Sequence, residues 1–119
     1  MPKSLPLITD TSPICCEPLT SSRMISERDA LALAQRLKAL ADPTRVQLLS
    51  LLMTQPAQQA CTCELAPAVK LSEPTVSHHL KQLLDAGLVT KDRRGLNVYY
   101  RLVPQSVKAI ARVLDLDCC

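Results

Sequence analysis

The stretch that decides the fold is LSEPTVSHHLKQLLDAG, residues 71–87. Ser72 is a favoured helix N-cap, Pro74 suits the first turn of a helix, and Gly87 is a usual stop signal. With 100° of rotation per residue, the apolar residues of this helix share one side and the short polar residues share the other. The apolar side comprises Val76, Leu80, Leu83 and Leu84. The sequence therefore predicts an amphipathic helix with a polar outward side.

The segments before and after this helix predict its partners. A short helix is expected over residues 63–69, and two helices joined by a tight turn form a helix-turn-helix candidate. Residues 88–90 and 98–102 are β-prone runs on either side of a basic tip at residues 91–97, which indicates a hairpin, or wing. The expected fold is mainly α with a small β-hairpin (α+β), a winged helix-turn-helix.

Two more helices are expected nearer the N-terminus. Ser26, with Asp29 three residues later, marks the start of the first, whose apolar residues repeat at helical spacing until Asp42. Pro43 suits the opening of the second, which is apolar nearly all round and ends before Pro56. We expect this second helix to lie in the core.

A final helix is expected from Pro104 to about Leu116. Its apolar residues fall on one stripe. They are Val107, Ile110, Ala111 and Leu114. Two interpretations stay open: the stripe packs into the core of its own chain, or it forms a dimer interface with the first helix.

Length and composition indicate one domain, since the chain has 119 residues of which 47% are hydrophobic. Residues 1–25, rich in Pro, Ser and Thr, are expected to form a flexible arm, residues 26–116 the folded domain, and residues 117–119 a tail. No apolar run approaches the roughly 20 residues of a membrane helix, and the start lacks an export signal. We therefore expect a soluble, cytoplasmic protein without a membrane partner. Its small size favours a binding module over an enzyme.

The basic residues are concentrated in one segment. The chain carries 14 Lys and Arg against 11 Asp and Glu, and the whole excess lies between Lys70 and Arg101. Such a local positive field attracts a polyanion such as double-stranded DNA. Thr and His on the polar side of the 71–87 helix can reach base edges, and Lys and Arg there and in the wing can reach phosphate. The candidate DNA-binding residues are Ser72, Pro74, Thr75, Ser77, His78, His79, Lys81, Arg93 and Arg94.

Three segments carry a resemblance to a known family. They are LADPTR at residues 40–45, LSEPTVSHHLK at 71–81 and AGLV at 86–89, followed by a wing that ends in tyrosines. In this combination the chain resembles the ArsR/SmtB family of winged-helix metalloregulatory repressors over residues 27–115. The resemblance implies a homodimer that binds promoter DNA in the metal-free form and dissociates when a toxic metal or metalloid binds.

The six cysteines need a functional account, because in a reducing compartment thiols serve metals or redox chemistry. The run CTCEL at residues 61–65 is similar to the Cys-Val-Cys-Asp-Leu box with which arsenic- and cadmium-sensing members of the family bind their effector. Two thiols two residues apart point about 200° apart on a regular helix, so both reach one ion only if the first turn is irregular. A helix N-terminus also lowers the pKa of a thiol. In some members arm cysteines join the helix thiols, so the candidate ligands are Cys15, Cys16, Cys61 and Cys63.

The number of ligands alone leaves the effector open. Trivalent arsenic or antimony takes three thiolates, whereas Cd(II), Pb(II) or Zn(II) takes three or four ligands. The pairing of an arm Cys-Cys with the helix box most resembles arsenite-responsive repressors, and no histidine lies near these cysteines. We therefore expect As(III) or Sb(III), with Cd(II), Pb(II) or Zn(II) as the alternative.

Two other features bear on the effector. The family's second common sensing site, on the last helix, uses Asp and His, and residues 104–117 contain no histidine. That site is therefore expected to be absent. Cys118 and Cys119 are expected to be frayed and dispensable rather than further ligands.

Two other functions compete with this interpretation. A thiol redox repressor would respond to oxidants through a disulfide that joins Cys15 or Cys16 to Cys61 or Cys63. A small thiol enzyme is disfavoured, because the sequence has no Cys-x-x-Cys in a βαβ setting, no Gly-rich phosphate loop and no carboxylate pair placed for acid–base catalysis. The sequence predicts a regulator and not an enzyme.

Overall fold

The computed structural model describes residues 24–114. The predicted arm up to residue 23, with Cys15 and Cys16, lies outside the described residues, and so does the end of the chain with Cys118 and Cys119. None of the helices between residues 24 and 114 has the length and apolar character needed to cross a membrane.

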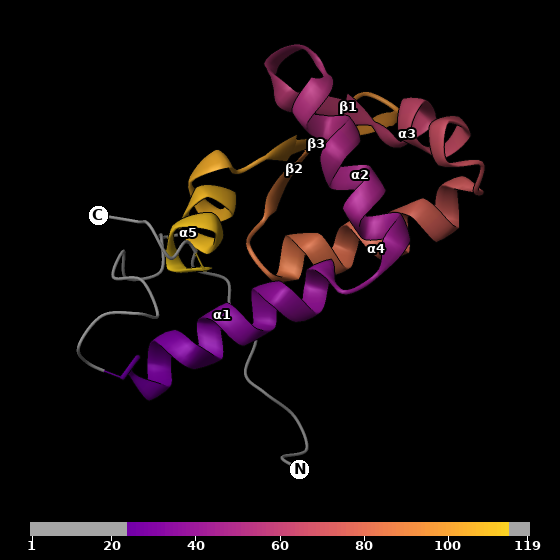
Figure 1. Cartoon of the computed structure of the whole chain (residues 1–119). Helices are drawn as coiled ribbons and strands as arrows, with labels where there is room; N and C mark the ends of the chain where they lie inside the picture. The colour runs from indigo at the N-terminus through magenta and orange to yellow at the C-terminus, as the bar shows by residue number, and fades with distance from the viewer. Residues whose placement is uncertain (1–23, 115–119) are drawn as a thin grey trace.

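Helices make up most of the described part, together with one small sheet (Figure 1). The helices are α1 (Glu27–Leu40), α2 (Pro43–Thr54), α3 (Thr62–Val69), α4 (Glu73–Asp85) and α5 (Pro104–Leu114), with a short 3₁₀ turn η1 (Pro56–Gln58). The strands are β1 (Gln59–Cys61), β2 (Val89–Arg94) and β3 (Asn97–Leu102). The helix pair α3–α4 followed by the hairpin β2–β3 confirms the predicted winged helix-turn-helix.

The first helix begins at the predicted cap Ser26, and the second begins at the predicted Pro43, with Asp42 as a cap that the sequence analysis did not name. Ser26 Oγ accepts the backbone N–H of Asp29 at 3.1 Å, at the start of α1. The carboxylate of Asp42 accepts the N–H groups of Thr44 at 2.8 Å and Arg45 at 3.3 Å, which caps α2. These bonds satisfy backbone donors that have no partner inside the helix.

The prediction that α2 lies in the core is confirmed for one side of the helix. Leu48, Leu49 and Leu52 are buried, whereas Val46 is 52% exposed and Met53 is 42% exposed. The inner side contacts α1, α3, α4 and the sheet. Leu51 is partly buried against the core, so of the apolar residues of α2 only Val46 and Met53 are exposed.

The sheet contains a strand that sequence analysis did not predict. Strand β1 pairs antiparallel with β3, so the strand order is β1-β3-β2 and Cys61 lies opposite Tyr99. The wing itself is longer than predicted, since β2 and β3 pair as far as Arg94 and Asn97. The turn between them places Gly95 at a φ of +63°, a left-handed conformation that glycine adopts without strain.

The inner side of α4 is anchored in the core. Val76, Leu80 and Leu83 are fully buried and pack in one apolar cluster with residues of α1, α2, α3 and the sheet. This result confirms the side predicted from the helical spacing. Burial of each such side chain stabilises the fold by about 1.5–3 kcal/mol, so the core fixes the orientation of α4 and its polar side faces outward.

The last helix buries a different set of residues from the predicted stripe. Its buried residues are Ser106, Ala109, Ile110 and Val113. Of the predicted stripe, Ile110 is buried and Val107 is half-buried, but Ala111 and Leu114 are exposed. The apolar side of α5 is wider than the part that the core of the same chain covers. In Figure 1, α5 lies on the opposite side of the molecule from α3.

Candidate functional site

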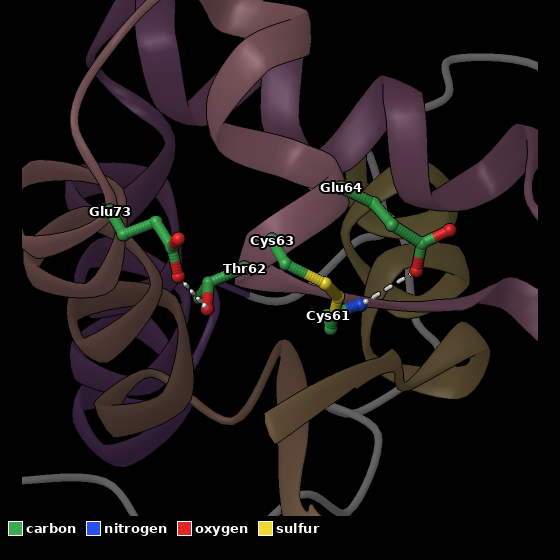
Figure 2. Close-up of a disulfide and its surroundings, with 5 residues drawn as sticks. All are labelled: Cys61, Thr62, Cys63, Glu64 and Glu73. Atoms are coloured by element: carbon green, nitrogen blue, oxygen red, sulfur yellow. Dashed lines mark hydrogen bonds between the residues drawn. A yellow bond between two sulfur atoms is a disulfide. The ribbon is translucent and has the colours of Figure 1, made fainter. Parts of the chain in front are cut away.

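Cys61 and Cys63 come together at the start of α3. Cys61 is the last residue of β1 and the extended N-cap of α3, so the helix begins one residue later, at Thr62. The two thiols therefore do not diverge as they would on a regular helix. Their Cα atoms are 5.2 Å apart, and the structure joins the two sulfur atoms in a disulfide (Figure 2). The junction of a strand and a helix thus supplies the irregular start that chelation by both thiols requires.

The donor atoms around this pair suit a soft ion. Cys61 is buried and Cys63 is exposed, so a ligand can approach from the Cys63 side. The carboxylate of Glu64 also lies close, and the ligand atoms of Cys61, Cys63 and Glu64 are all within 4.8 Å of one another. Once reduced, the pair offers two thiolates, which bind soft metals and metalloids, with one carboxylate oxygen beside them.

Two hydrogen bonds flank the cysteines on opposite sides (Figure 2). On one side, Glu64 Oε1 accepts the backbone N–H of Cys61 at 3.1 Å. On the other, Thr62 Oγ1 donates to Glu73 Oε1 at 3.2 Å. Glu73 is the first residue of α4. The segment that carries the thiols is therefore in direct polar contact with the helix that carries the candidate DNA-binding residues.

Thr62, Glu64 and Glu73 were not among the site residues predicted from the sequence. A glutamate in the first turn is common because it complements the helix dipole, so residue type alone gave no signal. The spacing of Glu64, three residues after the N-cap Cys61, is the pattern of a capping box and was the available signal. Nothing in the sequence indicated that Thr62 and Glu73 meet, because the turn between α3 and α4 determines that contact.

The outer side of α4 presents the predicted residues to solvent. Pro74, Thr75, His78 and Lys81 are exposed, and Ser77 is half-buried on the flank. Ser72 caps the helix: its Oγ accepts the backbone N–H of Thr75 at 3.4 Å and donates to Thr75 Oγ1 at 2.9 Å. The hydroxyls of these two residues are therefore fixed at the N-terminal end of α4, the end that a recognition helix presents to DNA.

Two of the predicted DNA-binding residues, Lys81 and Arg94, form ion pairs within the chain, and a third, His79, is partly buried. Lys81 Nζ lies 3.0 Å from Asp85 Oδ2, one turn further along α4. His79 is half-buried, and its Nδ1 is buried without a hydrogen-bond partner among the described residues. Arg94 is held at the base of the wing tip by several groups. These are Asp92 Oδ2 at 2.9 Å, Gln59 Oε1 at 2.9 Å and the ring of Tyr99 at 4.6 Å.

His79 also affects the pKa of Asp42, the N-cap of α2. Partial burial raises the pKa of Asp42, but the hydrogen bonds from the backbone N–H groups of Arg45 and Thr44 lower it, as do the nearby charges of His79 and Arg45. The balance leaves the pKa of this carboxyl below its ordinary value of 3.8. On β3, burial raises the pKa of Tyr100.

Together these features define a class of protein. A helix-turn-helix whose second helix exposes a polar N-terminal end, followed by a basic β-hairpin, is the architecture of a winged-helix DNA-binding protein. The additional feature is a pair of thiols at the start of the first helix of that motif.

Comparison with known proteins identifies the family. The family described as "Bacterial regulatory protein, arsR family" matches residues 42–91. The chain is 36% identical to a transcriptional repressor SmtB homolog of Synechocystis sp., over 92% of this chain and 87% of that protein. It is 44% identical to the arsenic resistance transcriptional regulator ArsR1 of Pseudomonas putida, over 67% of this chain and 64% of that protein.

A solved structure gives the same result. The AntR antimony-specific transcriptional repressor superposes with a TM-score of 0.65 at 30% identity, over 80% of this chain and 86% of that one. The chain therefore belongs to the ArsR/SmtB family of winged-helix regulators. This family consists of transcriptional regulators and not of enzymes.

Proposed function

We propose that this chain is a homodimeric transcriptional repressor that binds operator DNA in the effector-free state and leaves it when As(III) or Sb(III) binds cysteine thiolates. The observation that carries this proposal is the meeting of Cys61 and Cys63 at the start of α3. Relatives whose names refer to arsenic resistance and to antimony support the choice of a metalloid.

A third thiolate is needed for a pyramidal As(III) site. Cys61 and Cys63 supply two sulfur ligands, and we assign the third to Cys15 or Cys16. Because the arm lies outside the described residues, the assignment rests on the chemistry of the effector and not on a measured distance.

The DNA-binding surface follows from the exposed side of α4 and from the wing. We assign base contacts to Thr75 and His78, which are exposed near the N-terminal end of α4. Arg93 is assigned to the phosphate backbone, since it is exposed at the wing. The remaining candidates from the sequence position the protein on the backbone. These are Ser72, Pro74, Ser77, His79, Lys81 and Arg94.

A second candidate effector is a divalent ion, Cd(II), Pb(II) or Zn(II). The observation in its favour is the carboxylate of Glu64, within 4.8 Å of both thiols. A hard oxygen donor adds little for As(III) but completes a mixed site for a borderline ion such as Zn(II).

Fluorescence anisotropy of the reduced protein on its own promoter duplex tests the proposal. The complex is titrated separately with arsenite, antimonite, cadmium, lead and zinc. We expect release by arsenite and antimonite near one equivalent per site. Release by a divalent ion alone would replace the metalloid with the second candidate. Release by oxidant alone, reversed by reductant, would replace both with a redox regulator.

Cysteine variants locate the sensor. We expect Cys61→Ser and Cys63→Ser each to bind operator as the wild type does, while the arsenite concentration for half-release rises more than about tenfold, because one thiolate of the site is lost. The double variant Cys118→Ser/Cys119→Ser is the matched control and should respond as the wild type does. If both single variants release DNA at the wild-type arsenite concentration, the start of α3 is not the sensor.

A further inference from the structure

Thr62 lies between the two thiols and points away from them. Its side chain is mostly buried, at 8% exposure, and its hydroxyl donates to the carboxylate of Glu73 at 3.2 Å (Figure 2). Thr62 is the first residue of α3, and Glu73 is the first residue of α4. The bond therefore joins the starts of the two helices of the helix-turn-helix.

This hydrogen bond is the directional part of the contact between α3 and α4. In the part of the chain from residue 24 to 114, no other side-chain hydrogen bond joins these two helices. The two helices also share the apolar core, to which Leu65 and Ala66 of α3 and Val76 and Leu80 of α4 belong. Apolar contacts tolerate small rotations, whereas a hydrogen bond weakens steeply when its angle changes.

We propose that Thr62 and Glu73 are positioning residues that carry the state of Cys61 and Cys63 to the DNA-binding helix. This inference rests on the proposed function. When one ion binds both thiolates, the ion fixes the backbone torsions of the segment 61–63, and Thr62 lies at its centre. Because threonine is β-branched and has few χ1 positions, a rotation of its backbone moves the hydroxyl with it.

The negative charge of Glu73 determines whether effector binding strengthens or weakens DNA binding. Glu73 is exposed at the N-terminal end of α4, beside Pro74 and Thr75, which we assign to the DNA-binding surface. While Thr62 donates to Glu73, part of the carboxylate's hydrogen-bonding capacity is satisfied and its orientation is fixed. Loss of the bond frees the carboxylate to turn toward the phosphates, and like charges repel. Effector binding at the thiols thus weakens DNA binding.

The test measures operator affinity with and without arsenite and takes the ratio as the coupling. Arsenite binding itself is followed by the ultraviolet absorbance of the arsenic–sulfur bonds. We expect Thr62→Val to bind arsenite with the wild-type stoichiometry while the coupling falls about two- to tenfold, the worth of one hydrogen bond. Thr62→Ser keeps the hydroxyl and should keep the coupling. Thr54→Val, which removes a local hydroxyl bond at the end of α2, is the matched control and should also keep it.

A double-mutant cycle identifies the partner. Glu73→Ala should raise operator affinity, since it removes a negative charge near DNA, and should lower the coupling as Thr62→Val does. Thr62→Val added to Glu73→Ala should then lower the coupling no further. Glu73 is exposed, so Glu73→Ala carries the test alone if Thr62→Val does not fold.

The failures are distinguishable. A wild-type chain that binds arsenite but keeps its operator affinity overturns the proposed function and this inference with it. A wild-type chain that responds, alongside a Thr62→Val chain with the same coupling, overturns the inference alone. An equal loss in Thr54→Val would show a general effect of stability and would also overturn it.

Discussion

Arg93 and Arg94 are neighbours in the wing, but their surroundings differ. Arg94 is engaged by Asp92, Gln59 and the ring of Tyr99. Arg93 is exposed, and no ion pair or hydrogen bond within residues 24–114 involves its side chain. Arg93 can therefore contact a phosphate without breaking an existing side-chain interaction.

We expect Arg93→Ala to weaken binding to all duplexes and to lower the slope of log K against log salt concentration by about 1. Arg94→Ala is the matched comparison and should change that slope less, because Asp92 already neutralises part of its charge. Binding of operator and of unrelated DNA is measured between about 50 and 300 mM salt. Over this range the Debye length, which sets the screening of charges, changes about twofold. Equal slopes for Arg93→Ala and the wild type would remove Arg93 from the interface.

The thiol pair shows how far single residues could be predicted. The Cys-x-Cys spacing indicated a site, and the helical angle showed that a regular helix would separate the thiols. The structure meets that condition with an extended Cys61 at the end of β1. The sequence could not show this, because Gln59, Ala60 and Cys61 form a strand only through pairing with β3, about 40 residues later. The contact of Thr62 with Glu73 was equally hidden, since it depends on how α3 and α4 pack.

At the scale of elements, the sequence signals for helix starts were reliable, because they reflect hydrogen bonds between a side chain and the nearby backbone. Ser26 and Ser72 cap the helices at the predicted positions, and the second helix begins at the predicted Pro43. The strands were less predictable. Lys91, Asp92 and the wing arginines have low β-propensity, yet they lie in β2 because β3 pairs with them. Helix starts held by side chain to backbone bonds could be predicted from the sequence, whereas β1 and the outer part of the wing, which depend on pairing with β3, could not.

The cap of α2 predicts a dependence of stability on pH. The pKa of Asp42 is lower in the folded chain than its ordinary value of 3.8, so its ionised form is favoured by folding. That contribution is present above pH 3.8 and is lost as the pH falls through the lowered value. Asn is also a good N-cap but does not titrate, so Asp42→Asn keeps the cap and removes the ionisable carboxyl.

We therefore expect the wild type to exceed Asp42→Asn in free energy of unfolding at neutral pH, and the difference to shrink as the pH falls below 4. Urea unfolding of both proteins between pH 3 and pH 7 measures this difference. A difference that is constant over that range would show that the ionisation of Asp42 does not contribute to stability.

At the scale of the whole molecule, two helices expose apolar residues that residues 24–114 do not cover. On α1, Ala34 and Leu37 are exposed at helical spacing, and the C-cap residue Ala41 is exposed after them. On α5, Ala111 and Leu114 are exposed beside the buried side of the helix. Of the two interpretations of the last helix, packing into the core is confirmed for one side of the helix. The dimer interface with α1 stays a prediction, which the exposed apolar residues on the adjacent side favour. A relative in this family is described as a homodimeric winged helix-turn-helix domain.

A homodimer through α1 and α5 gives the last prediction. We expect Leu37→Glu combined with Leu114→Glu to shift the protein toward the monomer, because two charges replace apolar contacts at the interface. Leu96→Glu is the control for oligomeric state, since Leu96 is 98% exposed at the wing tip. Analytical ultracentrifugation measures the change. Loss of the dimer should also lower operator affinity. A dimer binds two half-sites in one association step, whereas two monomers need a separate association step for each half-site. A double variant that stays dimeric would place the interface on another surface, with exposed Val46 and Met53 of α2 as the next apolar residues to substitute.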